Sequence, residues 1–110
     1  MIHATSRHMN DTPIDHIKEK RDTYFGAEMR ARVRLAMTQE DALRYRVSRD
    51  VSDEEHAHMC FMVAIELSCV LVLLGAETEE SADAARRAAY AKARIEYAVE
   101  LRQRTQESAA

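Results

Sequence analysis

The stretch from Met59 to Leu74 constrains the fold of this chain more than any other segment. It reads MCFMVAIELSCVLVLL, and its only polar residues are Glu66 and Ser68. A buried β-strand would be much shorter than this apolar run. The segment therefore predicts a long apolar helix around which the other elements must pack.

The flanking residues predict where this helix begins and ends. Ser52 precedes three acidic residues, a pattern typical of a capping box at the positive end of a helix dipole. Gly75 follows the apolar run, where a left-handed C-cap is favoured. The helix is thus expected to have about 22 residues and to be about 33 Å long.

A membrane-spanning helix is the main alternative for this segment, because the window from Ala57 to Ala76 has the length needed to cross a bilayer. Glu66 lies at its centre, where an acidic residue costs roughly 2.5–3.5 kcal/mol in a membrane helix. Both flanks are acidic, so no basic residue anchors or orients a span. We therefore expect the core helix of a soluble protein and no membrane contact.

The distribution of side chains around this helix predicts self-association. Glu55, Glu66 and Glu77 fall on one narrow stripe, and nearly every other direction is apolar. Such a helix must be covered on all sides, and 110 residues supply too few other helices. We expect a homodimer. The large apolar side chains expected at its interface are Met59, Phe61, Met62, Ile65, Leu67, Val70, Val72 and Leu73.

The remaining sequence predicts an all-α fold in one domain, residues 12–107, between a flexible N-terminal arm (1–11) and a disordered tail (108–110). Few Gly or Pro residues interrupt the chain, so we expect a small antiparallel bundle of three to four helices, with the very apolar helix at its centre and homodimerisation completing the bundle. Thr12 and Pro13 begin the first helix. Its apolar seam continues to Tyr45 and favours one long helix, although Thr38 has the pattern of a second N-cap. Thr78 is expected to cap the last helix, which continues to about Gln106.

Polar residues on these seams predict a buried ion pair. Arg21 and Arg32 fall on the seam of the first helix, and Glu66 lies within the apolar run. A charge in such surroundings is stable when it is paired. We expect Glu66 to pair with at least one of these arginines, in the same chain or in the partner.

The sequence contains no motif typical of an enzyme, and we expect no catalytic activity and no cofactor. Cys60 and Cys69 are nine residues apart on one helix, too far for a disulfide. They are interpreted as small core residues, and a reducing cytoplasm is the expected location. Glu55 and His58 have the Glu-x-x-His spacing of di-iron bundles. Because the motif occurs once, a carboxylate/histidine metal-binding bundle is the weaker alternative.

These observations favour a non-enzymatic helical interaction protein, an adaptor, chaperone or regulator that binds another macromolecule. The alternative is a nucleic-acid-binding regulator, because residues 18–49 carry nine basic and five acidic side chains. The arginines expected at a nucleic-acid interface are Arg30, Arg34, Arg44, Arg46 and Arg49. Residues 50–83 carry nine acidic side chains and no Lys or Arg, and the net charge is −3, which favours a protein partner.

Overall fold

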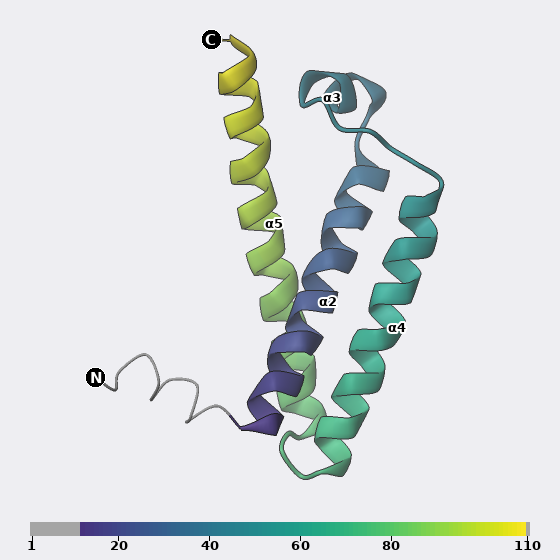
Figure 1. The fold of residues 1–110 in the computed structure, drawn as a ribbon, viewed down its shortest axis with the longest axis vertical. Helices are drawn as coiled ribbons and strands as arrows, with labels where there is room; N and C mark the ends of the chain where they lie inside the picture. The colour runs from purple at the N-terminus through teal and green to yellow at the C-terminus, as the bar shows by residue number, and fades with distance from the viewer. Residues whose placement is uncertain (1–11, 110) are drawn as a thin grey trace, which may run out of the picture.

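A computed structural model describes residues 12–109, which form four helices and, over that range, no strand (Figure 1). The helices are α2 (Pro13–Ala36), α3 (Gln39–Arg44), α4 (Ser52–Leu73) and α5 (Glu79–Ala109). The predicted all-α class is confirmed. The predicted arm, residues 1–11, and the last residue, Ala110, lie outside the described part of the chain.

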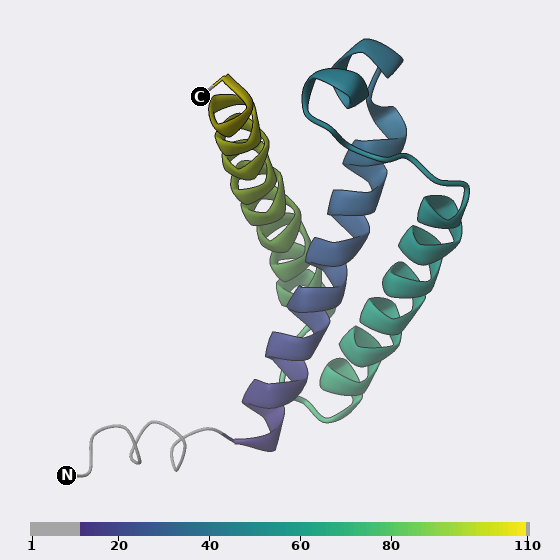
Figure 2. The same ribbon diagram turned by 45° about the horizontal axis from the view of Figure 1, so that its top comes forward.

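Helix α2, and not the apolar helix α4, lies between the other two long helices (Figure 1). Helices α4 and α5 each pack along α2 but contact each other little, and they diverge from the loop that joins them (Figure 2). The expectation that the most apolar helix occupies the centre is therefore wrong for a single chain. The reason is that α2 carries the side chains, Arg21, Phe25, Glu28 and Ala31, that are buried between two neighbours.

Helix α2 begins as predicted and ends earlier than its seam indicates. Thr12 is the N-cap, and its hydroxyl accepts from the Asp15 amide while the Asp15 carboxylate accepts from the Thr12 amide. The helix ends at Ala36. Thr38 then caps α3, with its hydroxyl accepting from the Asp41 amide at 3.1 Å. The prediction of a single helix that continues to Tyr45 is wrong. The N-cap at Thr38 outweighs the periodic seam, because the seam contains only weakly apolar residues after Thr38.

The start of α4 differs from the predicted capping box. Val51 is the N-cap and gives no side-chain cap. Two carboxylates replace the Ser52 hydroxyl as acceptors: the Asp50 amide donates to Asp53 (3.3 Å), and the Ser52 amide donates to Asp50 (3.2 Å). Carboxylates also complement the positive end of the helix dipole more strongly than a hydroxyl.

The end of α4 and the start of α5 agree with the sequence. Gly75 has a φ of 73°, and its amide donates to the Val72 carbonyl (3.0 Å), as in a Schellman motif. Thr78 accepts from the Ser81 amide at 3.0 Å and caps α5. Helix α5 continues to Ala109, so the tail expected at 108–110 is helical as far as it is described.

The hydrophobic core consists of two small clusters at different levels along α2. One contains Phe25, Ala64 and Ala89, and the other contains Val47, Tyr97 and Leu101. The radius of gyration is 17.0 Å, compared with about 13 Å for a compact chain of this length. A single chain is thus an open arrangement with a limited core.

Candidate interaction surface

Helix α4 presents two opposite faces, each with a heptad-like spacing. The inner face, with Ala57, Cys60, Ala64 and Leu71, is buried against α2. The outer face, which we define as Met59, Met62, Glu66, Val70 and Leu73, lies about half a turn away. In a single chain all five of its side chains are exposed. Although α4 is apolar in nearly every direction, its outer face is therefore uncovered in a single chain.

The outer face is extensive and mostly apolar. Leu73 is 86% exposed, Met59 55% and Met62 44%. Leu74 extends the patch beyond the helix end. Large exposed apolar patches on soluble proteins mark interaction sites. The outer face is accordingly the strongest candidate for an interaction surface.

The eight predicted interface residues separate into two groups. Met59, Met62, Val70 and Leu73 lie on the outer face, on the same side of α4 as Glu66, although the self-association was expected from the apolar directions away from the glutamates. The other four, Phe61, Ile65, Leu67 and Val72, are half-buried. Phe61 and Ile65 pack against the Phe25 core cluster, so they stabilise the single chain and are not free for a partner. Periodicity alone does not separate these groups, because every direction around α4 is apolar.

Glu66 does not pair with Arg21 or Arg32 in the same chain, so the intrachain form of that prediction is wrong. Glu66 is exposed on the outer face. The Arg21 guanidinium is buried and pairs with Glu77 and Asp22. Burial opposes the charge of Arg21, but its hydrogen bonds to Glu77 and Asp22 raise its pKa. Pairing of Glu66 with an arginine of a partner chain stays a prediction.

Glu77 replaces Glu66 because α4 ends at Leu73. Glu55, Glu66 and Glu77 share one stripe only if the helix continues through residue 77. The left-handed turn at Gly75 redirects the chain, and Glu77 then points inward with its side chain 8% exposed. The eleven-residue spacing places the three carboxylates on one stripe only within a continuous helix. Because α4 ends before Glu77, it is Glu77 that reaches Arg21.

Arg32, whose side chain is 49% exposed and so is not the core residue predicted, belongs to a second polar group, which centres on the buried Glu28. Its Nε donates to Glu28 at 2.6 Å, and the Tyr90 hydroxyl donates to the other Glu28 oxygen. Burial and the adjacent Glu28 carboxylate raise the pKa of Tyr90. The position of Glu28 on the α2 seam was a signal for burial, but Tyr90 is 62 residues away in sequence and shares no local pattern with it.

The arginines proposed for nucleic-acid contact are mostly engaged within the chain. Arg30 makes two hydrogen bonds of 2.8 Å to Glu100 and lies 5.1 Å from the centre of the Tyr97 ring. Arg34 binds Asp53 at 3.0 Å.

The other three arginines of this set lie around α3 and the loop that follows it. Arg44 lies near Glu40 and Asp41, and Arg49 donates to the Met37 carbonyl. Arg46 is exposed, with a φ of 57°. The structure therefore does not gather these five arginines into one free basic stripe.

The structure brings no further metal ligands to the Glu-x-x-His pair. Glu55 and His58 are both exposed on the first turns of α4. Among residues 12–109, no three His, Cys, Asp or Glu side chains are placed to hold a metal ion together. A metal site at this pair would need ligands from a second chain.

The two cysteines have different surroundings. Cys60 is buried, and burial raises the pKa of its thiol, with the Glu28 carboxylate adding to the effect. Cys69 is exposed, so its interpretation as a core residue is wrong for the single chain. Both thiols are free.

Helix α4 is the one described helix that is long and apolar enough to cross a membrane. Length and composition are weak evidence for a span, because core helices of soluble proteins have both. In a single chain only 22% of the apolar window is buried. The prediction of a fully buried helix is therefore not met without a partner.

Comparisons of the chain with models of protein families, with curated proteins and with solved structures find no match. Function must therefore be inferred from the geometry of this chain.

Proposed function

We propose that this protein is a non-enzymatic helical interaction protein, an adaptor, chaperone or regulator, and that it works as a homodimer joined through the outer face of α4. The observation that carries the proposal is the exposure of Met59, Met62 and Leu73 in a row along a helix whose opposite face is buried. Burying apolar area of this kind contributes roughly 25 cal/mol per Å². Solvent exposure of the whole row is correspondingly unfavourable.

A second copy of the chain is the occupant that this surface fits. A twofold axis through the outer face uses the same patch twice and closes the assembly. Standard interfaces bury about 800 Å² per partner. The outer face and Leu74 supply the exposed apolar side chains for such an interface. The open shape of the single chain, with its limited core, is consistent with an obligate dimer.

The charges on α4 lead to a specific expectation about this interface. Residues 50–83 contain no Lys or Arg, so a twofold pairing of two α4 helices brings Glu66 of each chain close to its equivalent with no basic residue of α4 to neutralise it. Glu66→Gln should therefore strengthen self-association. It should weaken self-association if an arginine of the partner chain pairs with Glu66 instead.

The test is light scattering on a sizing column across micromolar concentrations. The native chain should have about twice the mass of one 12.6 kDa chain. Met62→Glu places a second charge in the outer face and should give a folded monomer. Ile95→Glu is the matched control, because Ile95 is a 66% exposed apolar residue on α5, and it should leave the dimer intact.

Two results would contradict this proposal. One is a native chain that elutes as a folded 12.6 kDa monomer at all concentrations. The other is a dimer that Ile95→Glu dissociates and Met62→Glu does not. Circular dichroism establishes that each variant is folded, and the unfolding midpoint of a true dimer rises with protein concentration.

A further inference from the structure

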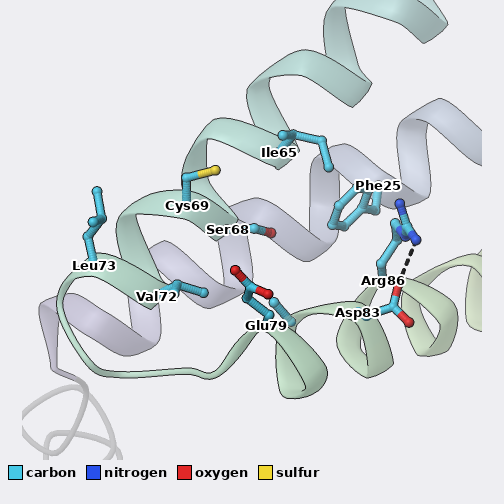
Figure 3. Close-up of a pocket in the computed structure, with 10 residues that line it drawn as sticks. Phe25, Ile65, Ser68, Cys69, Val72, Leu73, Glu79, Asp83 and Arg86 are labelled. Atoms are coloured by element: carbon cyan, nitrogen blue, oxygen red, sulfur yellow. Dashed lines mark hydrogen bonds and ion pairs between the residues drawn. The ribbon is translucent and has the colours of Figure 1, made fainter.

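A groove of about 470 Å³ lies between the last turns of α4 and the first turns of α5 (Figure 3). Phe25 of α2 contributes to its lining, and Ile65, Val72 and Leu73 line its α4 side. Its volume falls in the range of roughly 300–1,000 Å³ that is typical of small-molecule sites. The groove is separate from the outer face except at Leu73, which borders both.

The polar groups of this groove are few and mostly acidic. Glu79, Asp83 and Arg86 are its charged lining residues. The Arg86 guanidinium donates to Asp83 at 2.6 Å, and Arg87 also binds this carboxylate. Asp83 is therefore paired with both arginines. The Glu79 carboxylate has no ion pair among the described residues and is the one unpaired charged group in the lining of the groove.

Ser68 supplies a second unsatisfied polar group on the opposite wall. Its Oγ is buried and has no hydrogen-bond partner among the described residues. A buried hydroxyl without a partner is unfavourable, and a group that donates to it recovers that loss. Figure 3 shows the Glu79 side chain extending from α5 toward Ser68 and Val72 of α4. Glu79 and Ser68 both line the groove, and most of its other lining residues are apolar.

We propose that this groove binds an amphiphilic amine, a molecule with an apolar body and a protonated amino group. The apolar body would contact Phe25, Ile65 and Val72. The ammonium group would donate to the Glu79 carboxylate and, after a rotation of the side chain about χ1, to the Ser68 hydroxyl. An ammonium group has the donors that both oxygens lack and the charge that the acidic segment 50–83 favours. A carboxylate of the same length would meet Glu79 with like charge.

The probes are decylamine, decanol and decanoic acid, which share a hydrocarbon chain and differ in the head group. Calorimetric titration below the micelle concentration should give one decylamine site per chain, with decanol weaker and decanoate weakest. Glu79→Gln should weaken decylamine binding by about threefold to fivefold, the effect of one solvent-exposed ion pair. Ser68→Ala should weaken it by about tenfold, since a hydrogen bond to a charged group is lost.

The controls separate this site from non-specific attraction and from the dimer. Glu80→Gln removes the neighbouring exposed charge, which does not line the groove, and should leave binding unchanged. Met62→Glu should dissociate the dimer without changing the affinity for decylamine. Any of four results would overturn the proposal: equal effects of Glu79→Gln and Glu80→Gln, decanoate binding as tight as decylamine binding, several amine sites per chain, or no saturable binding. Circular dichroism confirms that every variant compared is folded.

Discussion

Replacing Glu77 by Gln removes one charge of a buried ion pair and changes the shape of the side chain very little. The Arg21 side chain is 2% exposed and that of Glu77 is 8% exposed, so the guanidinium that remains cannot be solvated by water. Removing one partner of a buried pair costs roughly 3–5 kcal/mol. Arg21 keeps its second partner, Asp22, at 2.9 Å, but that side chain is 47% exposed. We therefore expect a loss near the lower limit, about 3 kcal/mol.

A loss of this size is readily measured. It corresponds to a decrease in melting temperature of more than about 10 °C for a domain of this length. Urea unfolding followed by far-ultraviolet circular dichroism, at one fixed protein concentration, gives the free energy of unfolding for native and variant chains. Glu80→Gln is the matched control, because this exposed carboxylate on α5 lies away from the outer face of α4 and makes no ion pair among the described residues.

The outcome that refutes this reasoning is a Glu77→Gln variant within about 1 kcal/mol of the native chain, the range of an exposed pair. The double variant Arg21→Met, Glu77→Leu provides a further check. It removes both charges and replaces them with apolar groups, so it should be more stable than Glu77→Gln alone. If the double variant is the less stable of the two, the cost does not come from an unpaired buried charge.

Two further predictions concern the packing and the pH dependence of the bundle. Gly26→Ala should stabilise the chain by about 0.5–1 kcal/mol in urea unfolding, because Ala favours a helix. A Cβ at this position would lie 3.8 Å from the Ala93 Cβ, which is an ordinary contact. A loss of stability would mean that α2 and α5 lie closer together. The hydrogen bonds from Arg34 hold the pKa of Asp53 below its usual value. This carboxylate therefore contributes stability at pH values above its unfolded pKa of about 3.9. That contribution is lost as the pH falls through the lower folded pKa. The unfolding midpoint should therefore decrease below about pH 4, and Asp53→Asn should make that decrease smaller; equal slopes for both proteins would contradict the assignment.

Local chemistry determined the helices of this protein. Thr12 with Pro13, Thr38, Gly75 and Thr78 each mark a helix boundary that the structure has, because capping depends on residues only a few positions apart. The absence of strands from residues 12–109 and the length of α4 follow from composition and from an apolar run too long for a strand. Two boundaries differ from the prediction: α2 ends at Ala36 and does not continue to Tyr45, and at the start of α4 the Asp50 and Asp53 carboxylates replace the Ser52 hydroxyl as local acceptors.

Tertiary structure decided which faces are covered. The apolar pattern of α4 is nearly uniform around the helix, so it does not indicate which side of α4 meets α2. The structure places Ala57, Cys60 and Leu71 against α2 and thereby defines the opposite, outer face. The same holds for the polar contacts. Arg21 is 56 residues from Glu77, and Glu28 is 62 residues from Tyr90. Such pairs depend on helix ends and on the relative rotation of packed helices, which no local pattern in the sequence specifies.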